Sequence, residues 1–489
     1  MNIIINGFLD RRTNHIAQKV LSSINVETFI FTYNYFKPNF GRLNSKAILI
    51  NWRKINFMGN YDIDFNKLEP LDEDLVDAMR KYESIFMRMA DRLETFKNYS
   101  YRERKSLYLK HLRYWNDTIE KKKIDLFLSQ NVPHETSDFV CYCLCKLKNI
   151  PTIILCQTHI PDTCLIFDDW ENTDYGLVDE FKKLKTKLSR IKIDRINLSP
   201  RFEKYYLLQT DKSKNITPFY MKKNSLIKVG TKKIQAICRK LKENPTVYFH
   251  EGGLICRSLA RRSIDKIMTK ILMNFYEKNC TEFKPKSKYI FVALHVQPEM
   301  STSPRADVYV NQIMIVQLLA ACAPKDVKIF VKEHPNQRAL GRTKEFYQDI
   351  LSLKNVSLIS RKVDSKDLVK NSLAVATCVG LVGFESLFQN KPVLMFGHDF
   401  YQYAPGVFSI RTKSDLENAV KQINKGSTFK PKDFKIFLKA MDNISINGTT
   451  DSDYLPTSSL TIKENTLNIA QAIIKKNRKI SEKKCLNII

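Results

Sequence analysis

The sequence predicts an α/β fold of two domains, each with a parallel sheet, that face a central cleft. Three observations support this prediction. With 489 residues, the chain is too long for one ordinary domain. Hydrophobic residues make up 43% of it, enough to form real cores, so a largely disordered chain is excluded. Short apolar strands alternate with amphipathic helical segments in both halves, as they do where helices cover both faces of a parallel sheet.

The first half contains several candidate strands and two long helical runs. The candidate strands are residues 2–5, 28–32, 47–51, 126–129 and 152–156, and the helical runs are residues 75–95 and 102–122. Mainly apolar strands are typical of parallel sheets that are buried on both faces. We expect residues 1–178 to form the first domain.

The same alternation returns in the second half. The candidate strands are residues 289–293, 328–332, 356–359, 373–377 and 392–396, and the helices between them are residues 306–323, 343–351, 365–371 and 381–390. We expect residues 286–430 to form the second domain.

Two helical segments lie outside these domains. Residues 179–285 are rich in lysine and are expected to connect the domains, and residues 431–489 are expected to pack back across both halves. Ligands of folds with parallel sheets bind at the carboxyl ends of the strands, so we expect the site between the domains. No run of about 18 apolar residues predicts a membrane-spanning helix, and the start of the chain lacks the basic and long apolar regions of a signal peptide.

The net charge is strongly positive. The chain has 80 Lys and Arg against 51 Asp and Glu, a formal charge of +29. Such a charge favours a polyanionic partner, which could be nucleic acid, anionic lipid or an acidic glycan. An equally simple interpretation is a lysine-rich composition whose charges are solvated. No RNA-binding motif or zinc finger is present, so nucleic acid is not expected as the partner.

The cysteines and acidic residues do not predict a metal centre. The chain has 11 cysteines, an odd number, and no export signal, which indicates reduced thiols in a cytoplasmic protein. Cys141, Cys143 and Cys145 lie in an apolar helical stretch, where this spacing directs them to different faces, so we expect them in the core. The Asp-x-Asp pairs lack a preceding strand. We therefore expect neither a metal nor another cofactor.

Two motifs with candidate binding residues follow the first strand of the second domain and its neighbour. After residues 289–293, one loop contains His295, Gln297 and Glu299, and Arg305 follows it as a candidate phosphate or sugar contact. After residues 328–332 comes the second motif, Lys332-Glu333-His334-Pro335. Its imidazole can donate to a phosphate oxygen, and its proline fixes the exit of the chain from the strand. The alternative is an ordinary loop histidine.

Two more motifs follow later strands. Gly380 and Gly383 lie where the strand 373–377 turns into a helix, so backbone and helix amide groups can approach an anion closely. Glu385 and Ser386 follow in the same helix, where Glu385 can accept a ribose or sugar hydroxyl. The alternative is simple helix packing, with Glu385 complementing the helix dipole. The fourth motif runs from Lys391-Pro392-Val393 to Gly397 and ends beside aromatic residues.

In this order the four motifs resemble those of the bacterial capsule and surface polysaccharide biosynthesis glycosyltransferases, a group that includes the Kdo transferases. The first half is similar to the family more loosely, at His134-Glu135 with Asp138 and between Gln157 and Asp162. The resemblance covers residues 126–169 and 288–408. Leu381 departs from the family pattern, because Thr or Ser often stands there near the donor phosphate.

The resemblance implies a GT-B architecture with two Rossmann-like domains, of which the second binds a nucleotide-sugar, with a CMP-sugar such as CMP-Kdo favoured. It implies that His334 stabilises the leaving phosphate without a metal and that Glu385 binds the ribose or the sugar. The donor-binding residues it implies are His295, Gln297, Glu299, Arg305, Lys332, His334, Pro335, Gly380, Gly383, Glu385 and Ser386.

On the acceptor side, the general base is expected from the first domain. Glu135 and Asp138 are the candidates, with His134 next and Gln157 as a further acceptor-side residue. The alternative is that Glu135 and Asp138 only cap the helix that follows them.

The expected partners are a nucleotide-sugar and a glycan or glycolipid acceptor. The positive charge also predicts peripheral association with an anionic membrane on its cytoplasmic side. Two other functions share parts of this pattern: an enzyme that resembles the sugar-nucleotide 2-epimerases, and a non-catalytic basic protein that binds nucleic acid or glycan.

Overall fold

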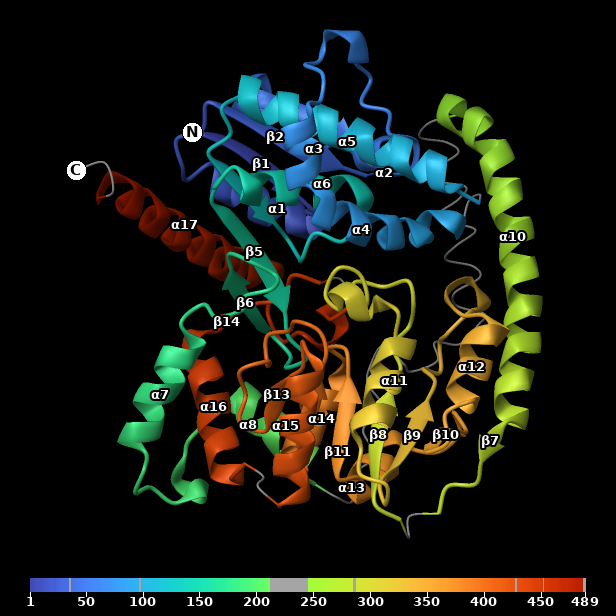
Figure 1. The fold of residues 1–489 in the computed structure, drawn as a ribbon. Helices are drawn as coiled ribbons and strands as arrows, with labels where there is room; N and C mark the ends of the chain where they lie inside the picture. Colours follow the sequence, from blue (N-terminus) through green and yellow to red (C-terminus); the bar gives the residue numbers. More distant parts are fainter. Residues whose placement is uncertain are drawn as a thin grey trace.

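The computed structural model describes residues 1–34, 37–95, 98–211, 245–284, 287–426, 429–451 and 453–486. For residues 57–58, 95, 245–260 and 483–486 it describes the backbone alone. The chain folds into two α/β lobes that lie one above the other, with a long helix, α10, along one side of both (Figure 1).

The first lobe is built on a seven-stranded sheet in which the five strands predicted from the first half are parallel. Two short antiparallel strands, which the sequence analysis did not predict, extend one edge. Across the sheet the strands are β14 (Ile446–Asn447), β6 (Thr163–Phe167), β5 (Thr152–Gln157), β4 (Leu126–Ser129), β1 (Asn2–Asn6), β2 (Thr28–Tyr33) and β3 (Ala47–Asn51).

Helices cover both faces of this sheet. They are α1 (Arg11–Leu21), α2 (Trp52–Met58), α3 (Glu73–Ala78), α4 (Arg80–Met89), α5 (Tyr101–Lys121) and α6 (Thr136–Leu147), with short 3-10 turns η1 (Gly41–Lys46), η2 (Phe65–Lys67) and η3 (Ala90–Thr95). Helix α5 begins with a capping box, in which the Ser100 hydroxyl accepts the N–H of Glu103 and the Glu103 carboxylate accepts the N–H of Ser100. The helical run predicted over residues 75–95 is confirmed, although it is divided into α3, α4 and η3.

Helix α6 carries the three closely spaced cysteines. Cys141, Cys143 and Cys145 are all buried and free, which confirms that they belong to the core. The eight cysteines that the structure describes are free thiols.

The second lobe has a seven-stranded sheet in which every pairing is parallel. Across the sheet the strands are β13 (Val407–Ser409), β12 (Val393–Met395), β11 (Ala374–Thr377), β8 (Tyr289–Ala293), β9 (Lys328–Lys332), β10 (Val356–Ile359) and β7 (Cys280–Thr281). The strands β8, β9, β10, β11 and β12 lie within the predicted ranges.

The helices of the second lobe are α11 (Ile313–Cys322), α12 (Lys344–Leu351), α13 (Ser365–Asn371), α14 (Leu381–Phe388) and α15 (Lys413–Asn424), with the 3-10 turns η6 (Asp307–Val310) and η7 (Ala339–Gly341). The prediction of a continuous helix over residues 306–323 is wrong. Asp307 has a positive φ of 47°, so the segment forms the short turn η6 before α11 begins.

The helical connector includes α7 (Leu177–Lys187), the 3-10 turn η4 (Ile193–Arg195), α8 (Pro200–Thr210) and α10 (Pro245–Lys278). After the second lobe come α16 (Pro431–Ile444), β14, the 3-10 turn η8 (Leu455–Thr457) and α17 (Ile462–Leu486). Helix α16 packs against α7, β14 pairs with β6 of the first sheet, and α17 packs against α1 (Figure 1). The chain therefore returns to the lobe in which it started.

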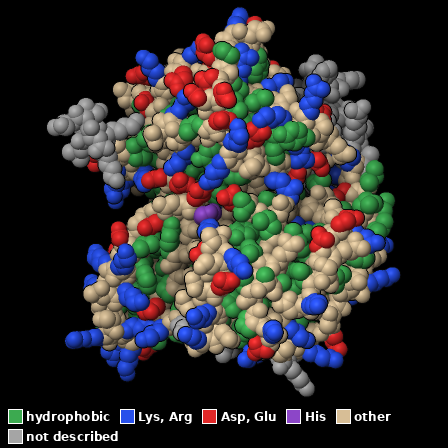
Figure 2. Space-filling view, in the orientation of Figure 1, with side chains coloured by type: hydrophobic (Ala, Val, Ile, Leu, Met, Phe, Trp, Pro, Cys, Tyr) green, Lys and Arg blue, Asp and Glu red, His purple; other side chains and the backbone are tan. Residues whose placement is uncertain are grey.

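The carboxyl ends of the two sets of parallel strands point toward each other, as the arrows of β5 and β8 show (Figure 1). Side chains join the lobes there: the Arg305 guanidinium donates to Cys156 Sγ at 3.3 Å, and Thr173 Oγ1 donates to the Asp399 carbonyl at 2.9 Å. A furrow between the lobes is visible on the surface (Figure 2). The prediction of two α/β domains with parallel sheets that face each other is confirmed.

No helix in the described part of the chain is both long and apolar enough to cross a membrane.

Asp162 fastens the returning segment to the first lobe. Its buried carboxylate accepts hydrogen bonds from Thr449 Oγ1 at 3.1 Å, from the N–H and hydroxyl of Ser459 at 2.8 Å, and from Ser458 Oγ. Burial alone would raise the pKa of Asp162, but these hydrogen bonds outweigh it and lower the pKa.

We predict that Asp162→Ala lowers the free energy of unfolding by about 2–4 kcal/mol, because several donors lose a charged acceptor. The matched control is Asp168→Ala, which removes a carboxylate that is 59% exposed and is paired with Lys476, and should cost at most about 1 kcal/mol. Urea denaturation measures both. Because the pKa of Asp162 is lowered by folding, its contribution should be complete above the ordinary aspartate pKa of about 3.9 and disappear as the pH falls further. Equal losses in the two variants would contradict the prediction.

Candidate active site between the two domains

The order of strands brings three of the sequence motifs side by side. Strand β8 lies between β11 and β9 in the second sheet, so the loops that follow these three strands are neighbours at one edge. The loop after β8 carries His295, the loop after β9 carries His334, and the turn after β11 carries Gly380. The positive charge that His334 would carry when protonated lowers the pKa of His295, in agreement with this arrangement.

His295 packs into the glycine turn. Its Nε2 lies 3.3 Å from Thr377 Oγ1 and accepts the N–H of Val379 at 3.4 Å. A Cβ on Gly380 would lie 2.5 Å from the same nitrogen, so only glycine leaves room for the ring. Burial, the nearby His334 and Arg342 lower the pKa of His295 to about 3, so the ring is neutral at neutral pH. His295 therefore supports the turn from within.

His334 is held with one nitrogen free for a ligand. Its Nδ1 accepts the backbone N–H of Asn336 at 3.1 Å, and the backbone N–H of His334 donates to Glu333 Oε1 at 2.7 Å. Burial lowers the pKa of His334, an effect that Glu333 opposes and Lys332 reinforces. The neutral ring must then carry its proton on Nε2. His334 thus presents an N–H donor at the carboxyl edge of the sheet.

A buried ion pair positions both histidine loops. Arg342 Nε donates to Glu333 Oε2 at 3.0 Å, and both side chains are almost completely buried. The other guanidinium nitrogens of Arg342 donate to Gln297 Oε1 at 2.7 Å and to the His295 carbonyl at 3.0 Å. One arginine therefore fixes the loop after β8 to the loop after β9.

The sequence analysis did not identify Arg342 or the carboxylate of Glu333 as parts of this site. An arginine in a polar loop carries no spacing signal of its own. Glu333 was named as part of the motif Lys332-Glu333-His334-Pro335, in which a role was predicted for the imidazole of His334 and none for the carboxylate. The signal that could have found the pair is the acid next to His334, since a carboxylate that directly follows a buried strand requires a cation close by.

Gln297 forms hydrogen bonds within the protein through its backbone and its side chain. Its backbone N–H and C=O both bond to the amide of Gln337, at 2.9 and 3.1 Å, and its own side chain accepts from Arg342. Gln312 holds the adjacent His295 in the same way, accepting its N–H at 2.8 Å. The amide of Gln297 is therefore used within the loop, and its predicted contact with the donor stays a prediction.

Lys332 and Glu385 lie near the start of α13. Lys332 Nζ donates to the Val363 carbonyl at 2.6 Å and to Ser365 Oγ at 2.8 Å. Glu385 accepts a weak hydrogen bond of 3.4 Å from Gln209 of α8. Burial, opposed by nearby Lys366, raises the pKa of Glu385 to about 7. The Lys332 ammonium thus has partners within the fold, whereas among the described residues the Glu385 carboxyl has this weak partner alone.

Other residues of the predicted donor set have mixed positions. Pro335 and Glu299 are exposed as whole residues. The surroundings of the Glu299 carboxyl still remove part of its water, which raises its pKa in spite of Arg92. Ser386 is buried and donates to the Val382 carbonyl at 2.5 Å within α14. A Cβ on Gly383 would lie 2.5 Å from the Tyr401 hydroxyl. Ser386 and Gly383 therefore serve helix packing, which was the alternative interpretation of this motif.

Arg305 joins the lobes. Its guanidinium forms a buried ion pair with Asp399, with Nη1 and Oδ1 2.9 Å apart, and also donates to Cys156. Burial would lower the pKa of Arg305, but Asp399 and Cys156 outweigh it and raise the pKa. The charge of Arg305 is therefore paired between the domains, and its predicted contact with the donor stays a prediction.

The first lobe contributes Arg92 and the loop after β4. Arg92, in η3, donates to the carbonyls of His134 and Ser303, the latter at 2.8 Å, and lies 3.8 Å from Glu135 Oε1. Since η3 also packs against η7 of the second lobe, this group lies beside the loop after β9. The candidate residues of the two lobes are thus brought to one interdomain region.

His134 and Glu135 keep reactive atoms available there. His134 Nδ1 donates to the Val132 carbonyl at 2.7 Å, which leaves Nε2 as an acceptor, 3.8 Å from Glu135 Oε1. Burial and the nearby Arg92 lower the pKa of His134 to about 3. Burial raises the pKa of Glu135, although Arg92 opposes the effect.

Asp138 and Gln157 are used by the fold. Asp138 is buried and accepts the N–H of Glu135 at 2.8 Å and the amide of Asn6 at 2.9 Å. Burial and the neighbouring Glu135 raise the pKa of Asp138 to about 7. Gln157 donates to the Thr163 carbonyl at 3.2 Å and accepts the N–H of Thr450 at 3.0 Å. Asp138 thus forms the capping box of α6 together with the N-cap residue Glu135, and Gln157 joins β5 to the returning segment. The predicted roles of Asp138 and Gln157 on the acceptor side stay predictions.

Metal ligands do not gather at this site. Within the described residues, no group of three or more His, Cys, Asp or Glu side chains is arranged to hold a metal ion. Two cations of the region, Arg92 and Arg305, lie at the boundary of the lobes.

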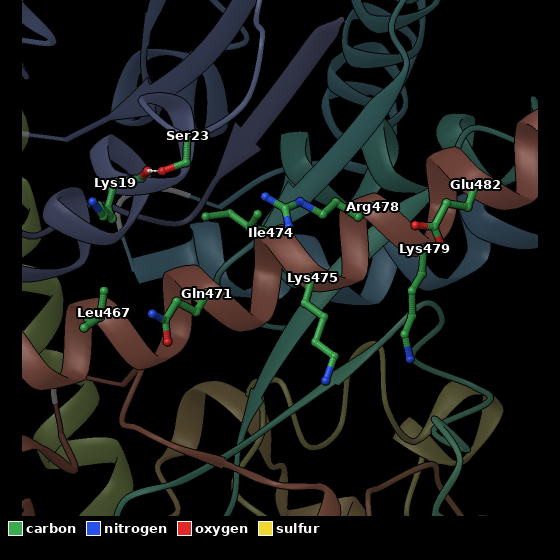
Figure 3. Close-up of a pocket in the computed structure, with 9 residues that line it drawn as sticks. All are labelled: Lys19, Ser23, Leu467, Gln471, Ile474, Lys475, Arg478, Lys479 and Glu482. Carbon is green, nitrogen blue, oxygen red and sulfur yellow. Dashed lines mark hydrogen bonds between the residues drawn. The ribbon is translucent and has the colours of Figure 1, made fainter.

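A hollow lined in large part by basic side chains lies away from the candidate active site. It has a volume of about 600 Å³ and is formed between α1 and α17 (Figure 3). Because α1 begins just after β1 and runs back along the sheet, its last turn lies at the edge opposite the candidate active site. The lining residues are Lys19, Ser23, Leu467, Gln471, Ile474, Lys475, Arg478, Lys479 and Glu482.

We predict that Arg342→Ala lowers the free energy of unfolding by about 3–5 kcal/mol, because it leaves the Glu333 carboxylate buried without its cation. The matched control is Arg80→Ala, which removes an arginine that is 76% exposed and should cost at most about 1 kcal/mol. Urea denaturation of the two variants tests this. A loss below about 1 kcal/mol in Arg342→Ala would show that the ion pair does not support the loops.

Comparison with known proteins agrees with the motif pattern. Residues 257–448 match the model of a family described as capsule polysaccharide biosynthesis protein. All four motifs of the second domain lie within this span. A search of curated proteins gave no match.

Solved structures show only distant likeness. The KpsC β-Kdo 2,7 transferase from Thermosulfurimonas dismutans is 11% identical, with a TM-score of 0.31, over 82% of this chain and 97% of that one. The UDP-GlcNAc 2-epimerase from Methanocaldococcus jannaschii is 12% identical, with a TM-score of 0.27, over 91% and 97%. Values this low carry no argument about activity. The family match carries more weight, and it agrees with the resemblance seen in the motifs: residues 257–448 are similar to the capsule polysaccharide biosynthesis protein family.

Proposed function

We propose that the protein is a glycosyltransferase of capsule or surface polysaccharide biosynthesis, which takes a sugar from a nucleotide-sugar bound at the carboxyl edge of the second sheet. The observation that carries the proposal is the state of His334. Its Nδ1 is occupied by the N–H of Asn336, so Nε2 carries a proton that it can donate. The family match supports the same function.

The arrangement suits the departure of a nucleotide phosphate. When the bond between sugar and phosphate breaks, negative charge develops on the phosphate oxygen, and a positioned donor stabilises that charge. His334 Nε2–H is such a donor, and its neutral ring needs no counter-ion. The guanidinium of Arg92 adds positive charge at the domain boundary. We propose that these groups act without a metal ion.

On the acceptor side, Glu135 is the best candidate for the general base. A general base needs a carboxylate that is near the reacting group and not already saturated with hydrogen bonds. Asp138 accepts two hydrogen bonds as a cap, whereas the contacts of the Glu135 side chain with Arg92 and His134 are long, at 3.8 Å. We therefore assign the base to Glu135 and a positioning role to Asp138.

The donor is proposed to be a CMP-sugar, with an acidic sugar such as Kdo as the transferred group. This choice rests on the resemblance of the His-Pro motif to that of the Kdo transferases. Glu385, whose raised pKa keeps part of it protonated near neutral pH, can donate to as well as accept from a ribose or sugar hydroxyl.

We predict that CMP raises the melting temperature of the protein more than UDP or GDP does, and that His334→Ala abolishes this stabilisation. Turnover of a CMP-sugar should fall by about 10²–10³-fold in the same variant, because one donor to the leaving group is lost. The matched control is His15→Ala, at an exposed histidine of α1, which should change neither quantity.

Three outcomes would contradict the assignment. Stabilisation by CMP that survives in His334→Ala would place the nucleotide elsewhere. Activity that is lost on treatment with EDTA and restored by a divalent cation would refute the metal-independent mechanism. Release of an epimerised sugar from UDP-GlcNAc without any acceptor would identify a 2-epimerase instead.

We predict that Glu135→Gln lowers kcat by about 10²–10⁴-fold while CMP still stabilises the variant, because the amide keeps the shape but cannot accept a proton. In the wild type, the base must be ionised, and burial raises its pKa. Activity should therefore fall on the acid side at a pH above the ordinary glutamate pKa of about 4.3. Asp138→Asn serves as the comparison and should mainly lower stability. If Asp138→Asn alone abolished turnover in a protein of normal stability, the assignment of the base would be wrong.

A further inference from the structure

Helix α10 carries an exposed row of large aliphatic side chains. Ile264, Ile267, Met268 and Ile271 are 59%, 62%, 50% and 58% exposed. Their spacing of three and four residues places them on one face of the helix. We call this row the α10 stripe. Single exposed aliphatic residues are common, but a contiguous row marks a surface that contacts something else.

The stripe is not a poorly packed part of the core, because the helix is already docked through other residues. Leu272, Met273 and Tyr276 are buried in the second lobe. Asp265 pairs with Arg338, and the Thr269 hydroxyl accepts the N–H of Ala339 at 2.9 Å. With these contacts made, the stripe points away from the molecule, along the side that α10 forms in Figure 1. Hydrophobic side chains are visible at that edge of the surface (Figure 2).

The charges beside the stripe are positive. The two acids in residues 261–278, Asp265 and Glu277, are each paired with an arginine of the second lobe. Basic side chains remain on the exposed parts of the helix, and the structure gives no ion pair to them. They are Arg262, Lys266, Lys270 and Lys278.

We propose that the α10 stripe is the surface by which the protein docks on an anionic lipid leaflet. A helix with an aliphatic face and flanking lysines lies in the interface of a membrane, where the aliphatic side chains enter the boundary of the acyl chains and the ammonium groups meet lipid phosphates. The net charge of +29 adds long-range attraction to the same surface. This proposal is independent of the donor, the acceptor and the reaction.

Flotation of the full-length protein with vesicles tests the proposal. One set contains phosphatidylcholine mixed with phosphatidylglycerol, and the other contains phosphatidylcholine alone. The wild type should float with the anionic vesicles, and much less with the neutral ones. Ile267→Ser combined with Ile271→Ser should weaken binding by at least about tenfold, since two aliphatic side chains no longer enter the lipid. Lys266→Glu combined with Lys270→Glu should weaken it to a similar extent, and added salt should weaken binding of the wild type.

The matched control is Ile462→Ser, at an isoleucine that is 52% exposed on α17 and should leave binding unchanged. The substituted positions are exposed, so thermal melting should confirm that each variant is folded. The proposal is overturned if the wild type does not float with either vesicle, or if the variants of the stripe float as well as the control. It is also overturned if light scattering shows a dimer that the stripe variants abolish while vesicle binding stays unchanged, because the stripe would then bind a second copy of the chain.

Discussion

The architecture of the candidate active site depends on the ion pair between Glu333 and Arg342. Both side chains are buried, so neither charge has water to solvate it, and each needs the other in place. Through this pair the loop that bears His334 is fixed to the loop that bears His295. His295 in turn fills the space that Gly380 leaves open. The orientation of the His334 donor is therefore set by a chain of contacts that begins at an arginine of no obvious function.

The sequence predicted the fold well because its signals are local. Parallel strands buried on both faces are apolar throughout, and this pattern located β8, β9, β10, β11 and β12 within their observed ranges. Of the strands that were missed, β7, β13 and β14 have two or three residues and lie at sheet edges, whereas β6 has five residues and lies inside the sheet. Two of the predicted helical segments are interrupted in the structure. Asp307, in a left-handed conformation, marks one such break, which periodicity alone does not reveal.

The candidate site was predicted in part. Residues at strand ends were correctly expected to meet, since topology alone brings such ends together. The sequence could not tell which of them would be used by the fold itself. Arg305, Asp138 and Gln157 have side chains suited to a ligand, yet each is engaged by a partner far away in the chain. Such partners are decided by tertiary packing, which leaves no periodic signal in the sequence.

The return of the chain through β14 to the first sheet has a mechanical consequence. A protein whose two lobes are joined by one linker can twist as well as open, whereas a second covalent crossing suppresses the twist. Here α8 packs against α14 of the second lobe, and α10 contacts both lobes. The segment from α16 to α17 returns to the first lobe, where it is tied down at Asp162. These separate connections therefore oppose a twist of one lobe against the other.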